Sequence, residues 1–363
     1  MRKALILTGF DPFAFTGGIE TFTKAFIDFL APWHIEADLV CASDFSNEHG
    51  LHQEFMGKVY AAGRSLLSLP PESHEFVMSN GYYGGVYFPK NMKTFTIFHS
   101  THAAYAEAIK GLVPLSTYLE IRFIVGELFE RTAAHGATII AVSHTVKSEL
   151  ERYYGLNEVE VVSNPVDTDF FYGLPQRNKL RNKYGVPADE KVGLFVGRWE
   201  TPKGKDVVEK VIGELHDMFW VIVTASGGQV FSCPSERSLV LSGLDKTQMR
   251  EMYSFSDFML FPSRYEGFGL AAAEAMACGL PVIGTPVGFL SEVYSEVPFS
   301  EISIPVSSLS RDDIVVTVKD RIDGLFAEKR FYEEISLRSR ELILKNYNLT
   351  IWRDRMKEIL CLS

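Results

Sequence analysis

The chain has 363 residues, of which 46% are hydrophobic and 23% charged, and its formal net charge at pH 7 is −10. This length fits two α/β domains better than one ordinary core, and the hydrophobic fraction excludes a largely disordered protein. The acidic balance argues against nucleic acid as a partner, and the sequence has no run of about 18 apolar residues that would predict a membrane-spanning helix.

Apolar runs of strand length alternate with helical stretches in the first half of the chain. The candidate strands are Lys3–Thr8, Asp38–Ser43, Glu75–Ser79, Thr94–His99, Thr138–Val142 and Val159–Ser163. Amphipathic segments such as Phe22–Leu30 and Thr145–Tyr153 lie between several of them. This alternation indicates a parallel sheet that helices cover on both faces.

One histidine of this half is a candidate site residue. His99 ends a predicted strand in the sequence FHSTH, and ligands of doubly wound sheets bind at the carboxyl ends of the strands. The alternative is a strand-end histidine that only bonds the backbone. We interpret His102, His135 and His144 as structural.

The segment Leu112–Phe129 (LVPLSTYLEIRFIVGELF) is strongly apolar. We predict that it is buried in the core, because it lacks the dense Lys/Arg face of a membrane-surface helix. Docking of a lipid-linked acceptor at a membrane face is the alternative.

Charge, proline and glycine cluster in Asp167–Glu190 without a strand pattern, so we expect the domain boundary there. The predicted domains are residues 1–172 and 185–345. The final helix, about residues 346–363, either caps the second domain or packs back on the first. We interpret the basic run Arg177–Lys183 as a solvated loop.

The second half repeats the alternation of strands and helices. Its candidate strands are Val192–Val196, Trp220–Thr224, Leu239–Leu241, Phe258–Phe261, Pro281–Gly284 and Ile302–Pro305. Two such series predict two doubly wound domains with a crevice between them.

The second domain opens with VGLFVGRWETPKGKDVVEKVI, in which a strand leads through a loop into an amphipathic helix. Arg198 and Lys203 lie on this loop, at the carboxyl edge of the predicted sheet. The planar fork of Arg and the mobile charge of Lys suit a diphosphate.

A glycine turn stands between a strand and an alanine-rich helix within Phe258–Pro286. Gly267 and Gly269 bracket Phe268, and the helix over Ala271–Ala277 opens on N–H groups that no bulky side chain shields. Donor geometry and the helix dipole make such an N-terminus an anion site.

Two carboxylates flank this turn: Glu266 before it and Glu274 within the helix. Carboxylates so near a phosphate would repel it, so we interpret both as groups that bind sugar hydroxyls. The segment therefore predicts a nucleotide-sugar site.

GRWETPKG and SRYEGFGLAAAEAMACGLPVIGT together closely resemble the retaining glycosyltransferase family four (glycosyl transferases group 1), of GT-B fold. Glu266 and Glu274 reproduce the E-x7-E spacing of that family. TGGIETF at 16–22, AVSHTVKSEL at 141–150 and NPVDTDFF at 164–171 resemble further family segments, in the same order. The resemblance implies two doubly wound, Rossmann-like α/β domains facing across a deep crevice.

The resemblance also implies a donor site that can be assigned residue by residue. Arg198 and Lys203 would hold the donor diphosphate, and Glu274 would bind the ribose hydroxyls. Leu244 lies where the family contacts the base, mostly through the backbone.

Backbone groups would bind the phosphate. The N–H groups of Phe268, Gly269 and Leu270 would bind the distal phosphate at the start of the helix. Gly17 and Gly18 would let the first helix approach the phosphate and the acceptor.

Glu266 and His99 would contact the transferred sugar and are the candidate catalytic residues. The implied reaction moves a sugar from a UDP- or GDP-sugar to a hydroxyl acceptor, with retention, in bacterial-type polysaccharide, glycolipid or glycoconjugate synthesis. Front-face attack assisted by the departing phosphate needs no protein nucleophile, so Glu266 is not assigned as one.

We expect no metal and no cofactor. The sequence has no evident Asp-x-Asp motif or His/carboxylate cluster, and the cations and helix N–H groups can stabilise the leaving group instead.

Two other interpretations stay open. The first is a sugar-nucleotide hydrolase, an epimerase or a phosphorylase of similar fold; the phosphorylase would need a lysine-bound pyridoxal cofactor. The second is a non-catalytic nucleotide-sugar binder, which has little reason to keep a carboxylate such as Glu266 facing the sugar.

The sequence departs from the family at VTASGGQV (223–230), which leaves the donor base open, and at Phe289, where a second glycine is common. The acceptor, saccharide or lipid-linked, also stays open. Four scattered cysteines (Cys41, Cys233, Cys278 and Cys361) and an N-terminus that we interpret as a strand rather than a signal peptide predict a cytoplasmic protein. Attachment to the inner face of a membrane is left open.

Overall fold

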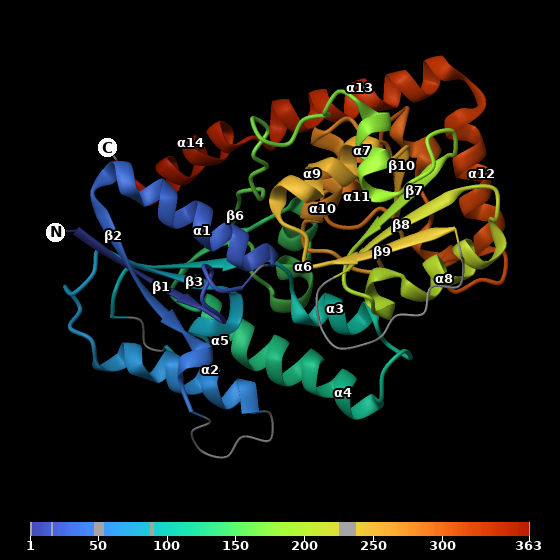
Figure 1. Ribbon diagram of the computed structural model, residues 1–363. Coiled ribbons are helices and arrows are strands. Elements are labelled where there is room, and N and C mark those ends of the chain that lie inside the picture. The colour runs from blue at the N-terminus through green and yellow to red at the C-terminus, as the bar shows by residue number, and fades with distance from the viewer. Residues whose placement is uncertain (1, 16, 47–53, 88–90, 225–236, 363) are drawn as a thin grey trace. The chain divides into compact units, whose positions relative to one another are not determined.

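The computed structural model describes residues 2–15, 17–46, 54–87, 91–224 and 237–362. The chain forms two compact units, one of Met1–Asn164 with Trp352–Ser363 and the other of Pro165–Ile351. Each unit is built on one sheet of parallel strands surrounded by helices (Figure 1).

The first unit contains a six-stranded sheet in the order β2-β1-β3-β4-β5-β6. Its strands are β1 (Arg2–Thr8), β2 (Ile35–Cys41), β3 (Phe76–Asn80), β4 (Thr94–Phe98), β5 (Thr138–Ala141) and β6 (Val159–Val161). Its helices are α1 (Gly18–Leu30), α2 (Glu54–Ser65), α3 (His102–Ala108), α4 (Leu115–Leu119), the π-helix η6 (Glu120–Glu130), α5 (Arg131–Ala134) and α6 (His144–Tyr154). The strand order turns back between β1 and β3, the type of switch point at which doubly wound sheets bind ligands.

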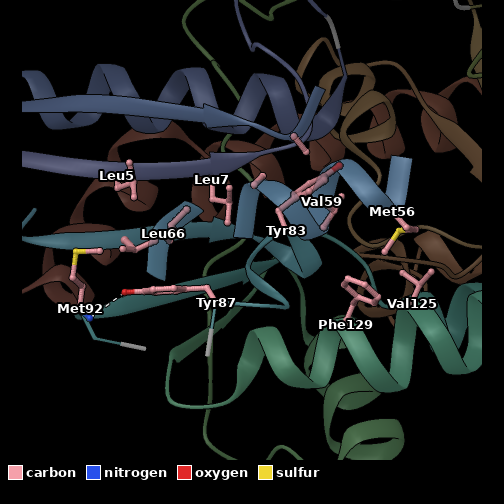
Figure 2. Packing of buried hydrophobic residues seen from close by; sticks show 13 residues of the cluster. Leu5, Leu7, Met56, Val59, Leu66, Tyr83, Tyr87, Met92, Val125 and Phe129 are labelled. Atoms are coloured by element: carbon pink, nitrogen blue, oxygen red, sulfur yellow. Dashed lines mark hydrogen bonds between the residues drawn. The ribbon is translucent and has the colours of Figure 1, made fainter. Parts of the chain in front are cut away.

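Helices cover both faces of this sheet. Leu5, Leu7 and Val77 lie in a hydrophobic cluster with Val59 of α2 and Phe129 of η6 (Figure 2). Tyr87 closes one end of the cluster, where its hydroxyl accepts a hydrogen bond from the Met92 N–H at 3.1 Å (Figure 2).

Successive residues of a strand point to opposite faces, so Phe76 faces away from Val77 and its cluster. The ring of Phe76 packs against Phe26 of α1, with 6.4 Å between the ring centroids. The first sheet therefore has apolar contacts on both faces, as its near-continuous apolar strands predict.

The last helix, α14 (Leu349–Leu360), carries the chain into the first unit. Trp352 is 3% exposed and lies edge-on to Phe22 and Phe29 of α1, at 5.6 Å from each ring. The sequence left two positions open for this helix, a cap on the second domain or packing against the first. The structure shows packing against the first.

The second unit contains a five-stranded sheet in the order β11-β10-β7-β8-β9. Its strands are β7 (Val192–Val196), β8 (Phe219–Thr224), β9 (Ser238–Ser242), β10 (Phe258–Phe261) and β11 (Val282–Gly284). Its helices are α7 (Arg177–Tyr184), α8 (Lys205–Glu214), α9 (Lys246–Phe255), α10 (Leu270–Ala277), α11 (Leu290–Val293), α12 (Ile314–Ala327) and α13 (Lys329–Asn346). The strand order turns back between β7 and β10, so the two loops that leave these strands meet at the switch point.

One domain boundary and one strand differ from the sequence-based prediction. Residues 165–172 belong to the second unit rather than the first, because their turn is bound there: Lys246 pairs with Asp167 at 2.8 Å, and Arg250 donates to the Phe170 carbonyl at 2.9 Å. The predicted strand Ile302–Pro305 is also wrong, because this stretch makes only an isolated bridge, between Ser303 and Gly284.

The basic run Arg177–Lys183 is the helix α7 rather than a solvated loop. Arg181 is 2% exposed, and its guanidinium donates to the Phe255 carbonyl and to the Asp257 carboxylate at 2.8 Å. Asp257 also accepts from the Val192 N–H at 2.7 Å, so this carboxylate joins α7 to the start of β7.

The prediction that Leu112–Phe129 is buried in the core is wrong for part of this segment. Val125 and Phe129 are buried in the cluster of Figure 2, but the other side of α4 and η6 is open to solvent. The exposed apolar side chains, 43–71% exposed, are Leu112 just before α4 and, on the two helices, Leu115, Leu119, Phe123, Ile124 and Leu128. We call this set the α4–η6 apolar face.

Residues 225–230 of the VTASGGQV segment and Cys233 lie outside the described residues, so no structure is assigned to them here. The other three cysteines, Cys41, Cys278 and Cys361, are free thiols.

Candidate functional site

The loops that follow β7 and β10 are fastened to each other. Gly204 has φ +81°, and a Cβ added there would lie 2.3 Å from the Pro262 carbonyl oxygen. The Arg264 N–H donates to the Pro202 carbonyl at 2.8 Å. Only glycine at position 204 allows this approach of the two backbones.

Arg264 reinforces the same junction and was not predicted from the sequence. Its side chain, 6% exposed, donates to the Thr201 carbonyl at 2.7 Å and pairs through both terminal nitrogens with Asp206 at 2.7–2.8 Å. A signal for it did exist, since it stands within the SRYEG segment immediately after a buried strand. Its partners lie in the segment after β7, about 60 residues away, and nothing in that segment indicates that Arg264 binds there.

The fastened loops bring together two of the predicted site residues. Lys203 Nζ lies 2.7 Å from Glu266 Oε1, which also accepts from the Ser263 hydroxyl at 2.8 Å. The side chains of Lys203 and Glu266 are 21% and 12% exposed. The switch point of the second sheet therefore carries a partly buried ion pair.

Arg198 lies on the same loop but is oriented differently. Its side chain is 64% exposed and pairs with Glu200 at 3.0 Å. The structure thus places this predicted diphosphate ligand at the surface of the second unit.

The glycine turn before α10 has the geometry of an anion site. α10 begins at Leu270, one residue earlier than predicted, and its N-cap Gly269 has φ +100° and supplies no side-chain cap. The N–H groups of the first turn of a helix have no partner within that helix, and the helix dipole makes this end positive.

Aromatic rings support this turn from inside the second unit. Phe268 is 3% exposed and stacks on Phe289 at 5.0 Å, while Tyr347 lies edge-on to both rings. The Phe289 N–H donates to the Phe268 carbonyl at 2.9 Å. The departure from the family at Phe289 therefore adds a ring that packs under the turn.

Glu274, in the middle of α10, is a half-buried carboxyl group. Burial raises its pKa to about 7, although the Tyr253 hydroxyl donates to it at 3.1 Å and partly opposes the shift. Near neutral pH this group is present in both protonation states.

Leu244 lies half-buried in the loop between β9 and α9. Gly243 before it has φ +66°, and Asp245 after it caps α9 in a reciprocal pair with Gln248. Both flanking residues fix the backbone of this loop, the part through which a base contact is predicted.

In the first unit, the glycines of the TGGIETF segment lie at the start of α1. Gly17 is the N-cap with extended backbone (φ −174°) and no side-chain cap, and both glycines are exposed. A Cβ added at Gly18 would meet no atom of the described structure within 4 Å. A Cβ added at Gly17 would lie 2.3 Å from Glu20 Oε2, so an acidic side chain of the first turn lies beside this glycine.

His99 follows β4 and bonds a side chain rather than the backbone. Its Nε2 lies 2.9 Å from Asn80 Oδ1, and its ring is edge-on to Phe22 at 4.9 Å. Burial lowers its pKa to about 3, so the imidazole is neutral. Within the described part of the chain its Nδ1 has no hydrogen-bond partner.

His102 has the structural role predicted for it. The buried carboxylate of Glu130 accepts from the His102 N–H at 2.9 Å and contacts the ring Nδ1 at 2.8 Å. This contact fixes the start of α3.

The described residues contain no group of three or more His, Cys, Asp or Glu side chains arranged to hold a metal ion. They also contain no helix with the length and apolar character needed to cross a membrane.

Two family sequence models match most of the chain. The model described as Glycosyltransferase Family 4 matches residues 16–170, and the model described as Glycosyl transferases group 1 matches residues 176–297. Among curated relatives, the D-inositol 3-phosphate glycosyltransferase of Xylanimonas cellulosilytica is 32% identical over 189 residues, which cover 47% of this chain and 45% of that protein. The chain spans about half the length of the curated relatives it matches.

Solved structures resemble the whole chain at low identity. Sucrose-phosphate synthase from Thermosynechococcus elongatus has a TM-score of 0.78 at 20% identity and covers 99% of this chain and 98% of its own. Anabaena HepE, solved in complex with UDP-glucose, has a TM-score of 0.71 at 15% identity and covers both chains fully. These likenesses, together with the two parallel-sheet units, give the chain the GT-B fold, and by its sequence it belongs to glycosyltransferase family four, the glycosyl transferases group 1.

Proposed function

We propose that the protein is a retaining glycosyltransferase that moves a sugar from a UDP- or GDP-sugar to a hydroxyl acceptor. The observation that carries this proposal is the Lys203–Glu266 pair beside the uncapped N-terminus of α10. A cation and a helix N-terminus suit a diphosphate, and a carboxylate next to them suits sugar hydroxyls.

This arrangement fits the charge changes of glycosyl transfer. The leaving nucleoside diphosphate gains negative charge as the bond to the anomeric carbon breaks, and preorganised donors stabilise that charge. Lys203 has three N–H donors, of which Glu266 uses one, so the others can reach phosphate oxygens. Arg198, which is exposed and paired with Glu200, would exchange this partner for the diphosphate when the donor binds.

The remaining candidates complete the proposed donor site. The N–H groups of Phe268, Gly269 and Leu270 would bind the distal phosphate, and Glu274 the ribose hydroxyls. In the other unit, His99 would contact the transferred sugar.

Glu266 is proposed to orient sugar hydroxyls rather than to attack the anomeric carbon. It already accepts two hydrogen bonds, from Lys203 and Ser263, which lowers its nucleophilicity. Retention would follow from front-face attack assisted by the departing phosphate, without a metal ion.

The comparisons support the two substrate classes. HepE was solved with UDP-glucose, which favours a nucleotide-sugar donor. The name of the Xylanimonas relative describes transfer to D-inositol 3-phosphate, which favours a polar hydroxyl acceptor such as a saccharide or a glycolipid head group. Polysaccharide, glycolipid or glycoconjugate synthesis is the proposed context.

A screen of UDP- and GDP-sugars tests the function directly. A true donor should raise the melting temperature and be consumed, and NMR of the product should give the same anomeric configuration as the donor. Donor consumption without a transferred product would favour the hydrolase alternative. Binding without any consumption would favour the non-catalytic binder.

Lys203→Ala tests whether this lysine binds the diphosphate of the donor. We expect at least about a tenfold loss of UDP affinity, because a charge-assisted contact to phosphate is worth about 1.5–3 kcal/mol. Lys210→Ala, an exposed lysine on the adjacent helix α8, is the control. Equal UDP affinities for the Lys203 variant and the wild type would remove Lys203 from the site.

The proposed metal independence has its own test. Turnover should persist in EDTA after dialysis. A loss that one divalent ion restores would contradict it.

We also propose a cytoplasmic enzyme that contacts a membrane face through the α4–η6 apolar face, which would suit a lipid-linked acceptor. Three free cysteines support a reducing compartment. Exposed apolar side chains along α4 and η6 support a surface contact.

A further inference from the structure

Three side chains from three elements of the first unit form one hydrogen-bonded chain. Asn80 ends β3, Thr23 lies in α1, and His99 follows β4. Asn80 and Thr23 are 1% and 0% exposed. Buried polar groups of this kind have a fixed set of partners, so their donors and acceptors can be assigned.

The direction of each bond follows from its partner. The Thr23 hydroxyl donates to the Ile19 carbonyl at 2.8 Å, because a carbonyl can only accept. Thr23 Oγ1 must then accept from the Asn80 Nδ2 group, at 3.0 Å. This turns Asn80 Oδ1 toward His99.

Only one neutral tautomer of the His99 ring is compatible with these bonds. Oδ1 of Asn80 cannot donate, so the His99 Nε2 at 2.9 Å must carry the hydrogen. Nδ1 then holds a lone pair, and this buried atom has no partner among the described residues. A lone pair on a neutral imidazole is a hydrogen-bond acceptor.

We propose that Asn80 and Thr23 are positioning residues that hold His99 as the neutral Nε2–H tautomer, so that its Nδ1 accepts a hydrogen bond from a hydroxyl of the donor sugar. The tautomer stands on the geometry of the first unit alone. Only the sugar contact rests on the proposed glycosyltransferase function.

The chain of bonds also ties His99 to the first helix. Thr23 lies five residues beyond Gly18, within the first turns of α1. A displacement of α1 would break the bond from Asn80 to Thr23 and release the amide. His99 therefore depends on the position of the helix that begins at the glycine pair.

Thr23→Val and Thr23→Ser form the matched test. Valine keeps the size but removes the hydroxyl, so the Asn80 amide can turn and offer its NH₂ to His99, which favours the other tautomer. Serine keeps the hydroxyl and should behave as the wild type. Melting temperatures of both variants establish that they fold.

The readout is ¹⁵N NMR of the full chain labelled at histidine, with His99 assigned by the signal lost in His99→Gln. In the wild type and Thr23→Ser we expect Nε2 protonated and Nδ1 unprotonated, and in Thr23→Val a mixture or the reverse. Nδ1–H in the wild type, or an unchanged tautomer in Thr23→Val, would overturn the assignment.

Asn80→Asp is a second variant with a different signature. A carboxylate facing Nε2–H stabilises the imidazolium, which turns Nδ1 into a donor. We expect the His99 resonances to shift toward the doubly protonated form at neutral pH. Unchanged resonances would mean that Asn80 does not face the ring.

Kinetics separate this proposal from the proposed function. With a donor found by the screen, Thr23→Val should lose about tenfold in kcat/KM for the donor, the loss expected for one hydrogen bond with an unpaired partner, and Thr23→Ser should retain it. Wild-type kcat/KM in Thr23→Val with an altered tautomer would overturn the sugar contact. If no donor is turned over, the proposed function fails while the NMR result still decides the tautomer.

Discussion

Glu274 has an environment that favours its neutral form. Burial in α10 raises its pKa to about 7 from the ordinary value of 4.5, and its contact from the Tyr253 hydroxyl only partly opposes this. Ionising the carboxyl group therefore costs more in the folded chain than in the unfolded chain. The neutral carboxyl group therefore contributes to the free energy of unfolding fully below pH 4.5, and this contribution is lost as the pH rises to about 7.

Glu274→Gln should remove this pH dependence. Glutamine keeps the acceptor for Tyr253 and cannot ionise, so the variant should gain stability relative to the wild type as the pH rises from 5 to 8. The measurement is urea denaturation of both proteins at several pH values. A difference in unfolding free energy that stays constant over this range would contradict the raised pKa.

The sequence could place the candidate residues on their loops, but it could not predict their contacts. Lys203 and Glu266 each stand on a strand-to-helix loop, which their local pattern indicates. Their ion pair depends on β7 and β10 being neighbours, with Phe258 opposite Gly193, a register that no local pattern encodes. Arg264 was missed for the same reason, because its partners Thr201 and Asp206 come from the loop after β7 and from the first turn of α8.

At the scale of elements, the junction of the two loops depends on one glycine. Gly204→Ala should destabilise the second unit by at least about 2 kcal/mol, because the residue has φ +81° and its new Cβ would meet the Pro262 carbonyl oxygen. UDP affinity should fall as well, since Lys203 is the preceding residue. Denaturation and UDP titration measure the two effects.

Gly213→Ala is the matched control in the following helix. Gly213 is exposed in α8, and a Cβ there would meet no atom within 4 Å. Alanine should stabilise this helix by about 0.5–1 kcal/mol and leave UDP affinity unchanged. Equal stabilities of the two variants would show that position 204 does not need glycine.

The α4–η6 apolar face should bind lipid. Burial of exposed leucine and phenylalanine side chains in a bilayer interface is favourable, and a charge on this face opposes it. We expect Leu119→Glu and Phe123→Glu to reduce sedimentation with vesicles of phosphatidylcholine and phosphatidylglycerol. Leu337→Glu, which alters a 61% exposed leucine of α13, is the control. No binding by the wild type, or equal binding by all variants, would contradict membrane contact.

Elements with a strong local pattern were predicted better than those defined by distant partners. The strands of both sheets were predicted within a few residues, apart from Ile302–Pro305. The helix α7 was missed because its apolar content is low, and its burial comes from Arg181, whose charge is met by Asp257 from the strand edge 76 residues away. A charged residue can be buried when such a partner is present, and a hydrophobic pattern does not show where that partner lies.

At the scale of the whole molecule, the chain passes between its two units twice. The first passage follows Asn164 and the second follows Ile351. Next to them, the Val166 N–H donates to the Tyr347 carbonyl at 2.7 Å, and Val166 also bridges to Asn348. The alternation of strands and helices predicted two domains, but the return of the chain depends on Trp352 meeting two rings of α1, more than 300 residues earlier.

Trp352→Ala should therefore destabilise the first unit alone. The indole is 3% exposed between Phe22 and Phe29, and removing such a ring costs about 3–5 kcal/mol. Hydrogen exchange followed by mass spectrometry should report faster exchange in α1 and β1, with β7 and β8 unchanged.

Trp220→Ala provides the matched control in the second unit, because Trp220 is 1% exposed there beside Phe258. It should accelerate exchange in β7 and β8 and spare α1. Faster exchange in both units of either variant would mean that the chain unfolds as one cooperative body, and the C-terminal helix would then stabilise the whole enzyme rather than one half of it.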